Sequence, residues 1–303
     1  MTEVYEGKIT TRARMLRVGA LLSAPGFLWL TLFLLLPILG LAVLAMASRG
    51  DYGAIDWTFS LSNLWRLLGA GLFGWSGDNL AILLRSATLA TITTALCLVL
   101  GFPMAFWICA RPRPARARLI ALVMVPSCTN LVIRTYAWML VLGAQMPPAW
   151  IARWAGLIGP DAALYPGSFA IYLGMLSAML PFAVLPLYTS VERLDWHIVE
   201  AARDLYATSF RTFRHGIFPQ VFPGLVAATV LTLVPSLGMF VVSDLLGGAR
   251  YMLVGNLVQQ QFGAASDWPF GAMVGMFLVA ASLLSLAVMR RWGSSLVNTE
   301  DVR

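Results

Sequence analysis

Six apolar stretches, each long enough to cross a hydrocarbon core as a helix, constrain this fold more than any other feature. A transmembrane helix needs about 20 predominantly apolar residues. Charged residues make up only 12% of the 303 residues, and strand-like alternation of polar and apolar residues is absent. We therefore predict an all-α integral membrane protein with six transmembrane helices. The stretches lie near Leu21–Met46, Leu80–Ala110, Leu119–Gly143, Ser168–Val191, Val221–Val242 and Phe270–Met289.

Basic residues predict which side of the membrane each connecting segment faces, because Lys and Arg are enriched in cytoplasmic segments. If the N-terminus is inside, most basic residues fall in inner segments. Only Arg49, Arg66, Arg153 and Arg250 fall in outer ones. We therefore place residues 1–20, 192–219 and 290–303 in the cytoplasm and assign 21–289 to one membrane domain. The net charge of +7 then follows from topology, so no nucleic-acid partner is expected.

Signatures of catalysis and nucleotide binding are absent from the sequence. Lys8 is the only lysine and no Gly-rich loop precedes it, which excludes a Walker A phosphate loop. His197 and His215 belong to no HExxH motif, and there is no nucleophile elbow. The three cysteines lie in apolar stretches without metal-ligand spacing. We predict no enzymatic activity, no catalytic residue, no metal site and no cofactor of the chain's own.

A polar, arginine-rich segment interrupts the apolar pattern between the fourth and fifth stretches. It contains EAARDLYATSFRTFRHGIFPQVFPG, from Glu200 to Gly224. Asp195 can cap a short helix, on which Glu200, Arg203 and Asp204 back an apolar stripe. The stripe consists of Ile198, Ala201, Ala202 and Leu205.

A second short helix is predicted after a break at Tyr206–Thr208. Ser209 can cap it. Gly216 and Pro219 then mark the start of the next span. The residues that share its apolar face are Phe210, Phe213 and Ile217. We expect a helix–turn–helix on the cytoplasmic membrane surface that docks another protein; the alternative is an ordinary connecting loop.

This pattern resembles the EAA loop of permease subunits of ABC importers. The matching residues are Glu200, Ala201 and Ala202, followed by Ile217, Phe218 and Pro219. The resemblance implies that residues 192–219, hereafter the coupling loop, dock on a separate ATPase subunit that uses ATP and Mg. Tyr206 stands where the family has glycine, which puts the sharpness of the turn in doubt.

Two further stretches, Arg134–Gly143 and Ser243–Gly271, look like permeases of spermidine and putrescine importers and their relatives. With the coupling loop, the resemblance covers roughly residues 119–289. It implies a bacterial inner-membrane location, a second permease subunit, an external solute-binding protein and a small solute. That solute is expected to be a polyamine or a related amine or opine.

Six residues are candidates for the solute pathway. Asn256 and Gln259 would lie on a short helix after a Gly247–Gly248 turn, unless that region merely touches the binding protein. Asp244 could attract a cation, or instead cap a helix or pair with Arg134. Arg134 itself favours a carboxylate-bearing solute. Tyr136 and Trp138 could line a cavity or belong to an aromatic belt.

The sequence therefore predicts a permease subunit that forms half of a translocation pathway. The principal alternative is a stand-alone, ion-coupled secondary transporter, which is expected to carry ionisable relays and an internal repeat of broken helices. A structural or assembly protein of the membrane is a second alternative, because it needs no polar residues along a pathway.

Overall fold

The computed structural model describes residues 18–19, 22–50, 53–71, 74–75, 77–159, 162–248 and 251–297. Most of the predicted segment 1–20 and residues 298–303 of the predicted tail lie outside these ranges. Within them, five helices are long and apolar enough to cross a membrane, or six if one bent pair forms a single span. The predicted helical membrane fold is confirmed.

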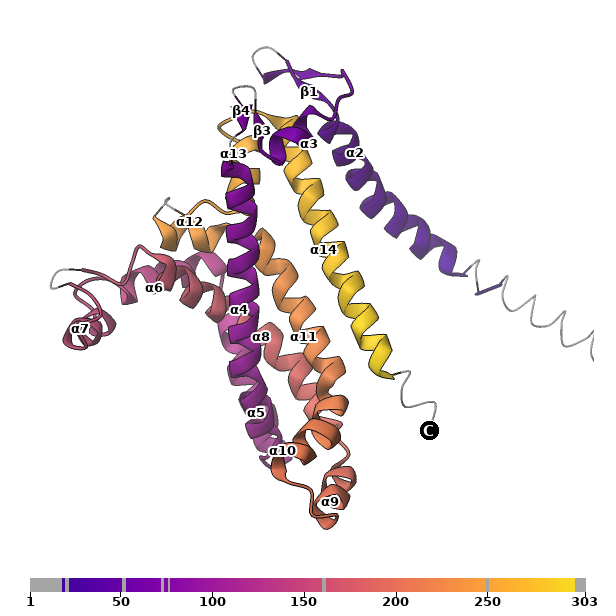
Figure 1. The fold of residues 1–303 in the computed structure, drawn as a ribbon, viewed down its shortest axis with the longest axis vertical. Helices are drawn as coiled ribbons and strands as arrows, with labels where there is room; N and C mark the ends of the chain where they lie inside the picture. The colour runs from indigo at the N-terminus through magenta and orange to yellow at the C-terminus, as the bar shows by residue number, and fades with distance from the viewer. Residues whose placement is uncertain are drawn as a thin grey trace, which may run out of the picture.

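Long helices form the body of the molecule (Figure 1). The first runs from Leu22 to Ala45 and includes a π-helical turn, η1 (Thr31–Leu35), and α2 (Leu36–Ala45). The others are α4 (Asp78–Cys109), α8 (Ser168–Glu192), α11 (Phe218–Gly238) and α14 (Trp268–Val297). Helix α2 packs along α14, whereas α4, α8 and α11 pack against one another.

The third predicted span, Leu119–Gly143, is wrong as a straight helix. Helix α5 (Arg113–Met124) continues as a 3-10 turn, η3 (Val125–Cys128), and α6 (Leu131–Val141) then leaves at 91°. Thr129 between them is extended, and the Asn130 side chain accepts a hydrogen bond from the Val132 N–H (2.8 Å) to start the new helix. A proline at the first turn of η3 and this cap together end one helix and begin another.

Small residues allow α8 and α11 to cross closely. A Cβ placed on Gly224 of α11 would overlap the Cβ of Ser190 and lie 2.8 Å from the Pro186 carbonyl oxygen. Ala178, Ala183 and Ala228 are likewise almost fully buried in this core. Close backbone approach through small residues is a common way to pack membrane helices. The α8–α11 crossing is therefore a tightly constrained point in the body.

Short elements gather at one end of the body, with the coupling loop at the other (Figure 1). They include α3 (Ser62–Leu67), and two antiparallel hairpins whose strands are β1 (Ser48–Arg49) with β2 (Ile55–Asp56), and β3 (Ala70–Gly71) with β4 (Gly74–Trp75). We call this the hairpin end. Helices α7 (Pro147–Trp154), α12 (Val241–Gly247) and α13 (Val254–Phe262) complete the connections.

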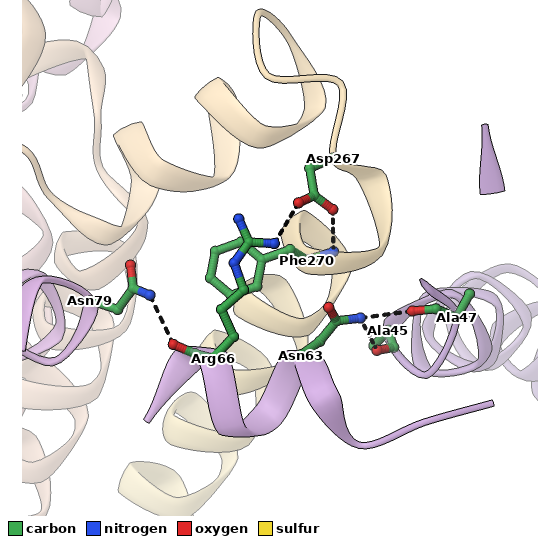
Figure 2. A network of polar contacts seen from close by, with 7 residues as sticks. All are labelled: Ala45, Ala47, Asn63, Arg66, Asn79, Asp267 and Phe270. Carbon is green, nitrogen blue, oxygen red and sulfur yellow. Dashed lines mark hydrogen bonds and ion pairs between the residues drawn. The ribbon is translucent and has the colours of Figure 1, made fainter. Parts of the chain in front are cut away.

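A network of polar contacts joins the elements of the hairpin end to one another (Figure 2). Arg66 of α3 donates to the buried Asp267 carboxylate (2.6 Å) and lies over the Phe270 ring, 4.2 Å from its centroid. Asp267 also accepts from the Phe270 N–H (3.3 Å), which caps α14. The Asn63 amide donates to the carbonyls of Ala45 (3.0 Å) and Ala47 (2.8 Å). The first helix, α3 and α14 are thus tied together.

Candidate functional site

The first helix of the coupling loop is α9 (Trp196–Asp204), and it begins where predicted. The Asp195 side chain accepts a hydrogen bond from the His197 N–H (3.0 Å), so the expected cap is confirmed. Val199 is the buried residue of α9, and it belongs to the core cluster that also contains Leu194 and the partly buried Ile217. The sequence did not predict that Val199 is buried, because Val199 lies outside the predicted apolar stripe.

The predicted apolar stripe of α9 remains largely uncovered. Ala201 is exposed, Ala202 is half-buried and Leu205 is 82% exposed. Ile198 on the same stripe is also exposed. The exposed Ala201 and Leu205 give this capped helix an apolar surface that is suited to burial against another protein.

The charged side of α9 is also solvated. Glu200 lies 3.9 Å from the ring of His197, and both side chains are highly exposed, so this pair contributes little to stability. Asp204 is exposed near the end of the helix. These groups are free of tight contacts within the described part of the chain and can meet a partner's charges.

Tyr206 makes the turn at the position where the resemblance predicts a glycine. Its φ is +55°, in the left-handed region, and its N–H donates to the Arg203 carbonyl (2.9 Å). The Ala207 N–H donates to the Ala202 carbonyl (3.0 Å), which completes a Schellman ending. The tyrosine side chain is 96% exposed. The turn is therefore sharp despite the missing glycine, and the side chain points away from the core.

The second predicted helix is wrong as a separate unit. Thr208, rather than Ser209, caps it by accepting from the Arg211 N–H (3.4 Å). Helix α10 (Ser209–Thr212) then passes through a π-helical turn, η4 (Phe213–Ile217), directly into α11. The fifth membrane helix thus begins at Ser209 and ends at Gly238.

Packing explains why the helix continues through Gly216 and Pro219, the residues predicted to mark the start of the next span. Gly216 is buried beneath α9, where an added Cβ would lie 3.9 Å from Ile198. The Phe213 ring meets the Phe102 ring of α4 edge-on, with centroids 6.0 Å apart. Pro219 falls in the first turn of α11, where a missing N–H is tolerated. Of the predicted second apolar face, Phe210 is exposed, whereas Phe213 and Ile217 contact the body.

The predicted pathway residues separate into two cavities. Arg134 and Trp138 line an apolar cavity of about 540 Å³ beside the break in the third span. Arg134 Nη1 donates to the Pro126 carbonyl (2.6 Å), and Trp138 Nε1 donates to Ser177 Oγ (3.0 Å). These hydrogen bonds therefore connect α6 to η3 through Arg134 and to α8 through Trp138. Tyr136 is half exposed and is not part of this lining.

The other cavity is more polar and has a volume of about 310 Å³. Asp244 of α12 and Asn256 and Gln259 of α13 line it, together with Tyr251, Met252 and Gln260. The predicted turn is confirmed at Gly248, which has a φ of +60° and ends α12. We call this the Asp244 pocket. The structure thus brings together three of the six predicted pathway residues.

Asn256 is buried in the wall of the Asp244 pocket, and its side chain forms hydrogen bonds with neighbouring residues. Its Oδ1 accepts from Ser243 Oγ (2.7 Å) and from the Leu253 N–H (3.2 Å). Its Nδ2 donates to Asp244 Oδ1 (3.1 Å). Asp244 and Gln259, by contrast, are exposed. The alternative of an Arg134–Asp244 ion pair is wrong, because the two residues line separate cavities and Arg134 bonds to Pro126.

Gln220 is a site residue that sequence reasoning missed. Its Oε1 accepts from the Asp195 N–H (2.9 Å), and its Nε2 donates to the Gly216 carbonyl (2.7 Å). It therefore bonds to the start of α9 and to η4. The available signal was a lone glutamine beside an apolar span, directly after Pro219.

A bundle of membrane helices with an uncovered coupling loop and cavities between its helices defines a membrane transport subunit. The chain belongs to the family of the binding-protein-dependent transport system inner membrane component, whose model matches residues 97–294. It is therefore a multi-pass inner-membrane protein. The predicted class, an importer permease, is confirmed, and the stand-alone transporter is not favoured.

Similar proteins agree with this assignment. The spermidine/putrescine transport system permease protein PotB of Escherichia coli K12 is 37% identical over 270 residues, covering 89% of this chain and 95% of that protein. The protein of the same name from Haemophilus influenzae is 32% identical over 265 residues, covering 88% and 90%. A crystal structure of a bacterial alginate ABC transporter with its alginate pentasaccharide-bound periplasmic protein shares the fold: the TM-score is 0.64 at 14% identity, covering 94% of this chain and 97% of that one.

Proposed function

We propose that this subunit forms half of the pathway through which an ATP-driven importer moves a polyamine or a related amine or opine across the inner membrane. The spermidine/putrescine permeases that match most of the chain support this solute class. The other components would be two ATPase subunits, a second permease and an extracytoplasmic solute-binding protein. Any ATP and Mg would be used by the ATPase subunits.

The uncovered face of α9 is the observation that carries this proposal. Leu205 is 82% exposed and Ala201 is exposed beside it, although the opposite side of the helix is anchored by the buried Val199. Such a face gains stability when a partner removes it from water. The basic residues of the adjoining segments favour a cytoplasmic position for this loop, and for both termini. The ATPase would therefore dock from the cytoplasm.

The Asp244 pocket supports an amine as the solute. Its carboxylate is exposed, and one oxygen already accepts from Asn256, which fixes the direction of the group. A carboxylate attracts an ammonium group, while the neighbouring Gln259 and Gln260 offer neutral hydrogen-bond acceptors. The Arg134 guanidinium in the separate apolar cavity is the feature that favours a carboxylate-bearing solute such as an opine.

Reconstitution with the other subunits tests the proposal. We expect the ATPase to co-purify with the wild-type chain, and Leu205→Glu to reduce its recovery about tenfold, because a charge replaces a buried apolar contact. Leu157→Glu, which changes an equally accessible leucine outside the coupling loop, serves as the control and should retain the ATPase. Equal recovery with both variants would contradict the docking role.

Uptake into proteoliposomes then tests the solute. Labelled putrescine and spermidine should accumulate with ATP, and Asp244→Asn should lower this uptake while basal ATP hydrolysis persists. If Arg134→Gln instead abolishes uptake of an opine and Asp244→Asn has no effect on it, the carboxylate-bearing solute is favoured. Accumulation of neither class would contradict the proposed solute.

A further inference from the structure

Gln220 joins the coupling loop to the fifth membrane helix through both polar atoms of its side chain. Its oxygen accepts from the backbone N–H of Asp195, and its nitrogen donates to the Gly216 carbonyl one turn earlier in the same helix. The Asp195 side chain simultaneously caps α9. A continuous set of hydrogen bonds therefore leads from the first turn of α9 to the base of α11.

Few other contacts fix the direction of α9. Val199 is its buried side chain, and Ile198 lies over Gly216. Apolar contacts of this kind are non-directional, so a helix can pivot on them. A hydrogen bond weakens steeply when its geometry departs from linear. The Gln220–Asp195 bond therefore restricts the angle between α9 and α11 more than these apolar contacts do.

Helix α11 leads from this bond to the Asp244 pocket. The helix runs without interruption to Gly238, and α12, which carries Asp244, begins at Val241. The α8–α11 crossing at Gly224 lies within the first two turns of α11. A displacement of the first turn of α11 can therefore reach the start of α12 along one continuous helix, which contains Pro223 and Pro235.

We propose that Gln220 is a positioning residue that passes movement of α9 to α11 during transport. This inference rests on the proposed function, because it requires an ATPase that moves α9. Gln220 forms its hydrogen bonds with Asp195 and Gly216, and not with a residue of the apolar stripe. Its removal should therefore separate ATPase docking from solute movement.

Two substitutions separate the two hydrogen bonds. Gln220→Leu keeps the approximate size of the side chain and removes both bonds. Gln220→Glu keeps an oxygen that can accept from Asp195 but cannot donate to Gly216. Thr189→Val, which removes a hydrogen bond confined to α8 (3.0 Å), is the matched control. Each is compared in the complete complex in proteoliposomes, with labelled spermidine as the probe.

We expect Gln220→Leu to recover the ATPase at the wild-type yield and to hydrolyse ATP. Its transport of spermidine per ATP should fall about fivefold, the change expected from loss of the one hydrogen bond that joins Gln220 to the start of α9. Gln220→Glu should stay within about twofold of the wild type, and Thr189→Val should be unchanged. Three results would each overturn the proposal. They are wild-type transport per ATP in Gln220→Leu, equal losses in Gln220→Leu and Gln220→Glu, and loss of the ATPase from Gln220→Leu.

A distance measurement tests the same link without transport. Spin labels at Arg203 on α9 and Leu231 on α11, both exposed, should give a broader distance distribution in Gln220→Leu than in Gln220→Glu. Identical distributions would contradict the positioning role. If the wild-type chain fails to bind the ATPase, the proposed function fails independently of these variants.

Discussion

The charged side chain of Asp267 is buried and hydrogen-bonded at the hairpin end of this molecule, whereas the charged side chains of the coupling loop at the other end are exposed. At the hairpin end, Asp267 is 1% exposed and is satisfied by Arg66 and by the Phe270 N–H. At the other end, Glu200 and Asp204 of the coupling loop are exposed, and the apolar stripe between them is uncovered. Buried, satisfied groups hold elements in one arrangement. Uncovered groups leave the coupling loop able to meet a partner and to move with it.

The largest expected effect comes from breaking the network at the hairpin end. Asp267→Ala should lower the free energy of unfolding by about 3 kcal/mol, because it removes a buried ion-pair partner and the α14 cap together. Thermal unfolding of the purified chain in detergent measures this. Asp267→Asn, which can still accept from Phe270, should lose less. A change below about 0.5 kcal/mol in Asp267→Ala would place the network among ordinary surface contacts.

A substitution at the α8–α11 crossing tests whether the region between the two ends is as tightly packed as the hairpin end. Gly224→Ala should destabilise the chain by about 2 kcal/mol, because the new Cβ overlaps Ser190. Gly238→Ala in the same helix, where an added Cβ meets no atom within 4 Å, is the control. Equal unfolding temperatures for the two variants would show that the helices separate easily.

Enlarging a residue of the apolar stripe on α9, where we propose that the ATPase docks, should change ATPase binding and leave the stability of the chain intact. Ala202→Trp is expected to weaken ATPase binding by about 1.5 kcal/mol, roughly tenfold, through overpacking of the interface. The unfolding temperature of the isolated chain should change little. Glu200→Arg should impair coupled ATP hydrolysis more than Glu200→Gln. Normal recovery and coupling in both Ala202→Trp and Glu200→Arg would reduce the segment to a connecting loop.

The smallest expected effect is a gain in stability. Tyr206→Gly should stabilise the chain by about 1 kcal/mol, because glycine adopts a positive φ without the steric cost that tyrosine bears. Transport should be nearly unchanged, since the tyrosine ring touches little of the body. Tyr206→Ala, which retains a Cβ, should gain much less. A large loss of uptake in Tyr206→Gly would assign the ring a direct role in docking.

The sequence was sufficient to predict the elements that depend on local properties. Stretch length and hydropathy predicted the membrane helices, and Asp195 predicted the start of α9, because a cap requires only residues that are close in the chain. The hydropathy of a stretch does not depend on the direction of its helix axis, so it could not predict the 91° bend after Cys128. It also could not distinguish a span that begins at Val221 from one that begins at Ser209.

These local patterns could not predict contacts between residues that are far apart in the sequence. Arg66 and Asp267 are 201 positions apart, and Asp195 and Gln220 are 25 apart. Their meeting depends on how complete helices pack, which no local spacing encodes. The Asp244 pocket was predicted better, because Asp244, Asn256 and Gln259 lie on two short helices that are close together in the sequence.

The close crossing at Gly224 also has a mechanical meaning. At 1.5 Å per residue, it lies about 9 Å along the axis of α11 from Phe218 and about 21 Å from Gly238. The crossing therefore divides α11 itself into a shorter part toward the coupling loop and a longer part toward Gly238. If α11 tilts about this crossing without bending at Pro223 or Pro235, a displacement at Phe218 is more than doubled at Gly238, close to the helix that carries Asp244.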